Sequence, residues 1–246
     1  MTRKLSPYEK THLQRFGKGD IDIADYGEMP VEYITGKVEF GEQVFEVNKN
    51  VLIPRVETEE FVNLALEKIE KEEVTIADVG CGSGAIGISV WLELQKKTVA
   101  TQMYLSDISA EAIKVTKRNV SNLIEEDENI KIFKSDLLES YPKDVKFDLI
   151  MANLPYIPSG RVAILDESVR KYEPHLALDG GEDGLKHIER LIKQAKDRLN
   201  PGGVILLEVD YTHDDEYLRR KLALDDMQLE TKQDQFQRMR FAIIIN

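Results

Sequence analysis

The chain has 246 residues and a formal net charge of −12, because 45 acidic residues outnumber 33 basic ones. Its apolar and charged fractions are ordinary for a globular chain that is long enough to bury a sizeable core. Nucleic-acid binding draws much of its affinity from neutralising phosphates, so this charge argues against direct binding of RNA or DNA. An acidic surface suits a basic protein partner better.

The numbers and spacing of cysteine and histidine argue against a disulfide-stabilised protein and against a metalloprotein. Cys81 is the only cysteine, so an intrachain disulfide is impossible, and the four histidines show no metal-ligand spacing. We therefore expect no metal site. The first twenty residues are polar and charged, and no apolar run is long enough to span a bilayer. We expect a soluble, cytoplasmic, monomeric protein without membrane attachment.

The chain divides into three predicted parts. Residues 1–28 form a short polar extension, which we expect to be helical. Residues 29–56 contain apolar residues in alternation, which predicts a β-hairpin. Residues 57–246 form the main domain. A helix is predicted from Glu57, because apolar residues follow it at helical spacing.

From residue 74 onward, predicted strands alternate with helices, which favours an α/β fold with a parallel sheet. The predicted strands are the apolar runs at 74–77, 100–105, 130–133, 147–152, 204–209 and 241–245.

A glycine loop follows the first of these strands and precedes a helical pattern. Gly80, Gly82 and Gly84 stand at alternate positions after Asp78, with Cys81 between the first two. Such glycines let the backbone approach a ligand closely and present N–H groups at a helix N-terminus. The GxGxG spacing differs from the GxGxxG of dinucleotide-binding folds.

Carboxylates follow the next two strands. Asp107 is positioned like the carboxylates that accept both ribose hydroxyls in nucleoside-binding α/β folds. Asp136 could accept a hydrogen bond from an adenine amino group. Either residue alone would more often be a helix cap or a turn residue. Together with the glycine loop they predict a nucleoside ligand.

The tetrapeptide Asn153-Leu154-Pro155-Tyr156 follows the run at 147–152. The side-chain oxygen of Asn153 and the main-chain carbonyl of Leu154 can accept the two N–H groups of a planar amino group. The residue before a proline is biased to extended geometry, which helps to direct that carbonyl. Tyr156 could stack on the planar group. An isolated Asn-x-Pro-Tyr would more often be a strand exit with a turn.

This order of motifs resembles the class I S-adenosylmethionine-dependent methyltransferases. Three segments narrow the resemblance to the release-factor glutamine methyltransferases of the HemK/PrmC family, namely Pro30–Gly36, Val51–Glu59 and Tyr172–Leu185. The resemblance implies a Rossmann-like α/β fold with a mainly parallel, seven-stranded sheet, helices on both faces and a preceding β-hairpin. It also implies that S-adenosylmethionine methylates N5 of the glutamine in the Gly-Gly-Gln motif of a peptide chain release factor, leaving S-adenosylhomocysteine.

The resemblance implies roles for individual residues. The catalytic positions are Asn153, Leu154, Pro155 and Tyr156. Those for the cofactor are Asp78, Gly80, Cys81, Gly82, Gly84, Asp107, Ile108, Asp136, Leu137 and Asn153. Those for the protein substrate are Phe40, Arg55, Glu57, Glu173 and the four catalytic positions.

Two departures from the family pattern leave alternatives open. The family's motif is usually Asn-Pro-Pro-Tyr, and the spelling with Leu154 is shared with the rRNA adenine dimethylases. Members of the family usually carry a separate helical domain before this region, and we expect a shortened N-terminal region here, because only about 28 residues precede Pro30. The alternatives are a nucleic-acid adenine N6-methyltransferase, which would have to flip its target base, and a non-catalytic protein that binds S-adenosylmethionine.

Overall fold

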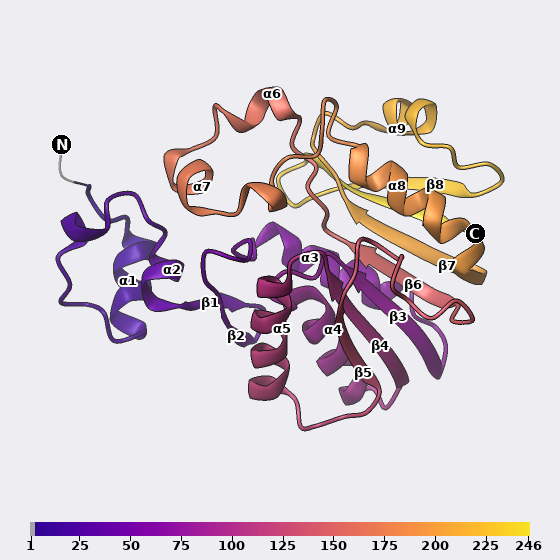
Figure 1. Ribbon diagram of the computed structural model, residues 1–246, viewed down its shortest axis with the longest axis horizontal. Helices are drawn as coiled ribbons and strands as arrows, with labels where there is room; N and C mark the ends of the chain where they lie inside the picture. Colours follow the sequence, from indigo (N-terminus) through magenta and orange to yellow (C-terminus); the bar gives the residue numbers. More distant parts are fainter. Residues whose placement is uncertain (1–2) are drawn as a thin grey trace.

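The computed structural model describes residues 3–246; residues 1 and 2, part of the predicted extension, lie outside that range. The N-terminal part forms a small helical lobe at the end of the molecule remote from the large sheet (Figure 1). A two-stranded antiparallel hairpin joins it to the main body. The elements of lobe and hairpin are α1 (Pro7–Arg15), η1 (Ile23–Tyr26), α2 (Val31–Thr35), β1 (Lys37–Phe40) and β2 (Gln43–Glu46).

The large sheet has seven strands in the order β5-β4-β3-β6-β7-β9-β8. The first five in this order are parallel, and β9 runs antiparallel to both of its neighbours. The prediction of a mainly parallel, seven-stranded α/β sheet behind a hairpin is therefore confirmed. The strands are β3 (Glu73–Val79), β4 (Ala100–Asp107), β5 (Ile130–Lys134), β6 (Phe147–Ala152), β7 (Leu199–Glu208), β8 (Gln228–Gln233) and β9 (Met239–Ile245).

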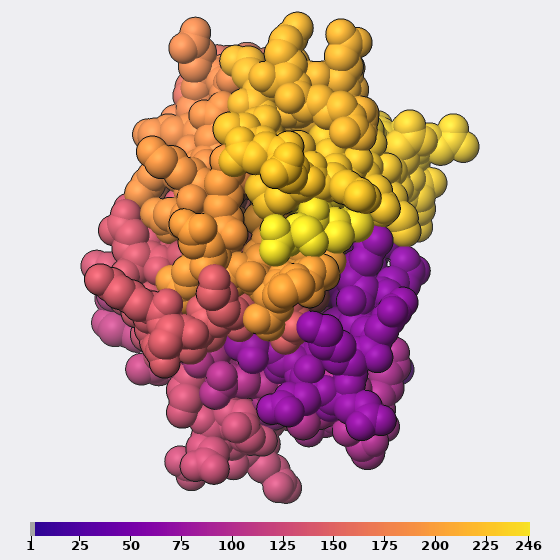
Figure 2. All heavy atoms as spheres, turned by 90° about the vertical axis from the view of Figure 1, so that its right-hand side faces the viewer, coloured from indigo at the N-terminus to yellow at the C-terminus, as the bar shows by residue number. Residues whose placement is uncertain are grey.

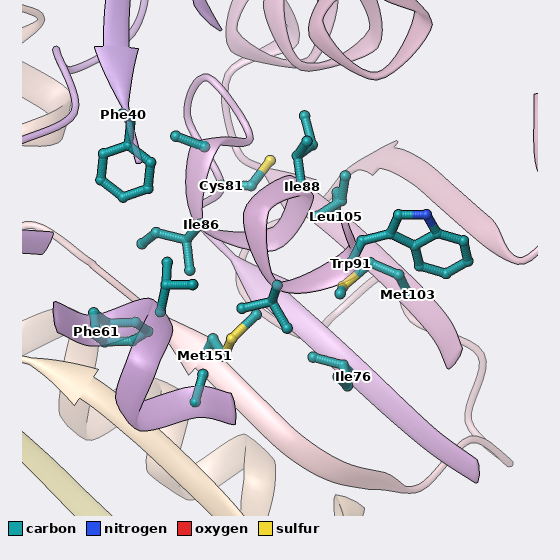
Figure 3. Close-up of a cluster of buried hydrophobic side chains, with 14 of the residues drawn as sticks. Phe40, Phe61, Ile76, Cys81, Ile86, Ile88, Trp91, Met103, Leu105 and Met151 are labelled. Atoms are coloured by element: carbon teal, nitrogen blue, oxygen red, sulfur yellow. The ribbon is translucent and has the colours of Figure 1, made fainter. Parts of the chain in front are cut away.

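Helices cover both faces of this sheet, as predicted. Alternate side chains of a strand point to opposite faces, so Ile76 joins one core and Ala77 the other. The first core packs against α3 (Glu57–Glu67), α4 (Ala85–Lys96) and α5 (Ala110–Leu123), and the second against α8 (Lys186–Ala195) and α9 (Asp215–Lys221). Figure 3 shows the first core, where Phe40 of the hairpin, Phe61 of α3 and Ile86 of α4 meet.

Short helices follow β6 in the chain, and the two that are labelled in Figure 1 lie at its upper left. They are α6 (Ser159–Val162), α7 (Glu167–Tyr172) and η2 (His175–Ala177), while η3 (Lys196–Arg198) leads into β7. No helix within residues 3–246 has the length and apolar character needed to cross a bilayer.

Most predicted elements occur where the sequence placed them, and α3 begins at Glu57. Two strands differ. β7 starts at Leu199, ahead of the predicted run, and its pairing with β6 shifts register between Phe147 and Leu149. β8 was not predicted because Leu229 is its only buried residue. It forms one edge of the sheet, where salt bridges join it to α3 between Lys68 and Glu230 and between Lys232 and Glu67; Figure 2 shows this face.

The strand order reverses between β3 and β6. The strand that follows β3 in the chain, β4, lies on one side of this pair in the sheet, and the strand that follows β6, β7, lies on the other side. In open α/β sheets, ligands bind in the crevice at the carboxyl ends of the strands at such a reversal. Both the glycine loop and Asn153 follow strands that flank this point.

Candidate functional site

A cleft of about 1170 Å³, including space open to solvent, lies at this edge of the sheet. Its walls come from the hairpin, the segment before α3, the glycine loop, the ends of β4, β5 and β6, and α8. The topology thus brings residues from most of the chain to one opening.

Most of the residues predicted for the site line this cleft. They are Phe40, Arg55, Gly80, Cys81, Gly82, Asp107, Ile108, Asp136, Leu137, Asn153, Leu154 and Pro155. The other five, which lie behind or beside the cleft wall, are Glu57, Asp78, Gly84, Tyr156 and Glu173.

The backbone of the glycine loop is in a left-handed conformation, which residues with a side chain adopt only with strain. Gly80 and Gly82 have φ values of 75° and 56°. A Cβ atom on Gly80 would lie 2.9 Å from Cδ2 of Leu154, so the loop and the tetrapeptide are in close contact. A Cβ atom on Gly82 would meet no atom within 4 Å, and Gly82 lines the cleft. A ligand can therefore approach the loop there without meeting a side chain.

Asp78 lies under this loop and is 1% exposed. Its Oδ2 accepts a hydrogen bond from the Gly87 N–H at 2.9 Å, whereas its Oδ1 is buried without a partner among residues 3–246. Burial raises the pKa of Asp78 to about 7, and the nearby Asp107 carboxylate adds to this rise.

Asp107 ends β4 and ties two loops together. Its Oδ2 accepts from the Gly82 N–H at 3.0 Å and its Oδ1 from the Ser109 N–H at 2.8 Å. Each carboxylate oxygen has a second lone pair, so both can also accept from a ligand in the cleft. Burial raises the pKa of Asp107, although these backbone hydrogen bonds oppose the rise. The adjacent Ile108 adds an apolar side chain, 42% exposed, to the cleft wall.

The end of β5 supplies the next part of the wall. Asp136 forms a salt bridge of 2.9 Å with Arg190 of α8, and both residues line the cleft. Leu137 has a φ of 51°, which is rare for a residue with a side chain. The Ser135 hydroxyl donates to its carbonyl at 2.7 Å and fixes this geometry. Such strain is common at ligand-binding sites.

A buried carboxylate lies behind the tetrapeptide. Glu208, at the end of β7, accepts hydrogen bonds from Asn153 Nδ2 at 3.1 Å, from the Tyr156 hydroxyl at 2.8 Å and from the Thr58 hydroxyl at 2.9 Å. Arg240 lies 3.9 Å from it. Burial raises the pKa of Glu208, and the hydrogen bonds and Arg240 oppose that rise. Burial also raises the pKa of Tyr156, which keeps its hydroxyl protonated as a donor.

The residues predicted for the protein substrate outside the tetrapeptide lie in three places. Phe40 lines the cleft but is 1% exposed and packs edge-on against Phe45. Arg55 donates to Glu173 at 2.5 Å, and Glu173 also accepts from the Ile53 N–H at 3.2 Å. Glu173 therefore holds the segment before α3 to the loop after α7. Glu57 is partly exposed, and its charge acts on Glu208.

These residues fit a nucleoside ligand. The open backbone at Gly82, the two oxygens of Asp107, the apolar side chains of Ile108 and Leu137 and the acceptor Asp136 line one side of the cleft. Asn153 and Pro155 line the part that adjoins the glycine loop. The cleft thus has space for a planar group on Asn153 beside a nucleoside on the glycine loop.

Sequence reasoning missed Glu208, Thr58, Arg190 and Arg240. Glu208 had a signal, because it ends an apolar strand run in the same way as Asp107. The other three lie within helices or a strand, where no pattern distinguishes them from ordinary surface or core positions.

Three comparisons with known proteins bear on this site. The family model of the methyltransferase small domain matches residues 60–182. A release factor glutamine methyltransferase of Clostridium acetobutylicum is 43% identical over 183 residues, which is 74% of this chain and 62% of that protein. One from Clostridium botulinum is 42% identical over 185 residues, 74% of this chain and 64% of that protein. The chain therefore spans somewhat less than two thirds of the length of these relatives.

Among solved structures, a methyltransferase of Pyrococcus furiosus aligns with a TM-score of 0.55 at 16% identity, covering 82% of this chain and 87% of that one. At this identity the likeness concerns the fold alone, and it agrees with the predicted fold class.

Proposed function

Because this chain belongs to the methyltransferase small domain family, we propose that it transfers a methyl group from S-adenosylmethionine to N5 of a glutamine in the Gly-Gly-Gln motif of a peptide chain release factor. Relatives that are about 40% identical bear the name of this activity. We assign catalysis to residues 57–246. We assign contact with the protein substrate to the hairpin segment 29–56 and to the surface around the paired side chains of Arg55 and Glu173.

The observation that carries the proposal is the contact between the two motifs. A Cβ atom on Gly80 would lie 2.9 Å from Leu154, and both residues line one cleft. A cofactor on the glycine loop and a planar group on Asn153 would therefore be neighbours. Such placement of two reactants accounts for a large part of the catalysis expected here.

The cofactor side is assigned as follows. Asp107 would accept the ribose hydroxyls, Asp136 the adenine amino group, and Ile108 and Leu137 would contact the adenine ring. Arg190 would hold Asp136 in place through its salt bridge. When bound, S-adenosylmethionine supplies an electrophilic methyl group on a sulfonium ion.

The acceptor side explains why a weak nucleophile reacts. The lone pair of a carboxamide nitrogen is delocalised, so the group must be held and polarised. The Asn153 side-chain oxygen and the Leu154 carbonyl would accept its two N–H groups. Both acceptors stabilise the positive charge that develops on nitrogen more than they stabilise the neutral ground state. The proton can then leave to water, so no dedicated base is needed.

The test is methyl transfer from labelled S-adenosylmethionine to three acceptors in parallel. These are a purified release factor, its Gly-Gly-Ala variant and an unpaired adenine oligonucleotide. The proposal predicts label on the native factor alone, located on the glutamine by mass spectrometry. Label on the oligonucleotide alone would establish the adenine N6 activity instead, and cofactor binding without any label would indicate a non-catalytic binding protein.

A further inference from the structure

Glu208 is a buried carboxylate that does not line the cleft. Its side chain is 2% exposed and lies behind Asn153. Three donors converge on it, the Asn153 amide, the Tyr156 hydroxyl and the Thr58 hydroxyl. A carboxylate so far from solvent is costly, and three hydrogen bonds offset only part of that cost. The desolvation free energy of this buried carboxylate, beside the candidate reaction site, suggests a functional role for Glu208.

The chemistry of the three contacts fixes which way the Asn153 amide faces. An ionised carboxylate only accepts hydrogen bonds, so the atom of Asn153 next to Oε2 of Glu208 must be the nitrogen. The other end of the amide is then the oxygen. Without such a partner, the terminal torsion of an asparagine is roughly two-fold, and both orientations are accessible.

We propose that Glu208 is a positioning residue that holds the Asn153 amide with its oxygen, and not its nitrogen, toward the methyl acceptor. This inference rests on the proposed function. The amino group that accepts the methyl presents N–H hydrogen-bond donors. If the Asn153 amide were turned by 180°, its own NH₂ group would face these donors and no hydrogen bond could form. Glu208 thus decides whether Asn153 binds or repels the acceptor.

Burial and the Glu57 charge raise the pKa of Glu208, whereas its hydrogen-bond donors and Arg240 oppose that rise and favour the ionised, accepting form. Thr58 is the second residue of α3, so the carboxylate lies at the positive N-terminal end of that helix. Arg240 adds a guanidinium at 3.9 Å, and Asp234 holds Arg240 through a salt bridge of 3.2 Å. The elements α3, β7 and β9 therefore all contribute to one orientation of Asn153.

Two substitutions separate orientation from simple packing. Glu208→Met keeps the length of the side chain and removes every acceptor. Glu208→Gln removes the charge but keeps one oxygen, which can accept from both Asn153 and Thr58 at the Oε2 position while its NH₂ donates to the Tyr156 hydroxyl. Thr101→Val is the matched control, since it removes a buried hydroxyl that donates to the Val99 carbonyl at the start of β4, away from the cleft.

The kinetic test compares kcat with the cofactor dissociation constant. Glu208→Met should lower kcat by at least about tenfold, because the Thr58 and Tyr156 hydroxyls lose their acceptor and can donate to the Asn153 oxygen instead. Cofactor affinity should stay within about threefold, because Glu208 does not line the cleft. Glu208→Gln should stay within about threefold of the original kcat, as should Thr101→Val. In an Asn153→Ala background, Glu208→Met should cause no further loss, because its effect passes through Asn153.

The proposal is overturned if Glu208→Met keeps its kcat, if Glu208→Gln falls as far as Glu208→Met, or if the loss persists in the Asn153→Ala background. A second measurement needs neither turnover nor a substitution at Glu208. The side-chain amide protons of Asn153, identified by NMR through their absence in Asn153→Ala, should exchange with solvent at least about tenfold more slowly than those of the exposed Asn129.

Exchange as fast as that of Asn129 would contradict the Glu208 contact itself. Slow exchange in a protein that methylates no release factor would refute the proposed function and leave the orientation of Asn153 intact.

Discussion

Arg55 and Glu173, 118 residues apart in the chain, form a salt bridge of 2.5 Å at the edge of the cleft. Glu173 is 1% exposed in its side chain and Arg55 is 36% exposed. The pair therefore joins the segment before α3 to the loop after α7. These are two of the segments in which the sequence resembles the release-factor glutamine methyltransferases.

Removing Arg55 should leave a buried carboxylate without its cation. We expect Arg55→Gln to lower the free energy of unfolding by about 1–3 kcal/mol, less than for a fully buried pair because Arg55 is partly solvated. Urea unfolding measures this change. The control is Lys96→Ala, which breaks exposed salt bridges to Glu42 and Glu93 and should cost less than about 0.5 kcal/mol. Equal effects of the two substitutions would refute the structural role of the pair.

Asp107→Ala should weaken cofactor binding by about 10- to 100-fold. It removes two acceptors in the cleft and also releases the N–H groups of Gly82 and Ser109. Titration calorimetry with S-adenosylmethionine measures the dissociation constant, and the exposed Asp144→Ala serves as the control for a lost charge. A dissociation constant unchanged in Asp107→Ala would remove the ribose assignment.

Gly80→Ala should destabilise the protein by about 1–3 kcal/mol. Its φ of 75° disfavours a side chain, and the new Cβ atom would lie 2.9 Å from Leu154. Gly160→Ala is the matched control, because a Cβ atom there meets nothing within 4 Å and the residue lies in α6. Thermal unfolding of both variants should separate them, and similar midpoints would argue against the close contact of the two motifs.

Asp78 predicts a pH dependence of stability. Its pKa is about 7 in the folded protein and 3.8 as the ordinary value. The folded state thus holds the proton more tightly, so this stabilising contribution is complete below pH 3.8 and is lost as pH rises through about 7. Asp78→Asn lacks this loss. Its free energy of unfolding relative to the original chain should therefore rise by about 2–3 kcal/mol between pH 5 and pH 8.

Urea unfolding of the cofactor-free protein at the two pH values gives this difference. Comparing the two chains at each pH cancels the other titrating groups. A difference that stays constant between pH 5 and pH 8 would show that Asp78 titrates normally.

The sequence predicted those parts of the fold and site whose signals are local. Asp107 and Asn153 stand at strand ends, and parallel strands bring their carboxyl ends to one edge, so their convergence could be predicted. The edge strand β8 could not be found, because only Leu229 of it is buried and its polar residues face solvent or α3. The partner of Arg55 depends on a contact across 118 residues that no local pattern encodes.

Glu208 shows the limit most clearly. It ends a strand as Asp107 does, but it accepts from Asn153, Tyr156 and Thr58 and does not face the cleft. Three-dimensional packing decides which carboxylate at a strand end faces the ligand and which one holds another side chain.

The role of Asn153 in methyl transfer is tested most directly by the rate of N5-methylglutamine formation on a release factor. This rate is compared between the original chain and Asn153→Ala, with the cofactor dissociation constant measured on the same preparations. In the proposed mechanism Asn153 binds the acceptor mainly in the transition state, so its loss should reduce kcat by about 100- to 1000-fold and change the dissociation constant by less than about threefold. Equal losses of rate and cofactor affinity, or an unchanged rate, would contradict the account.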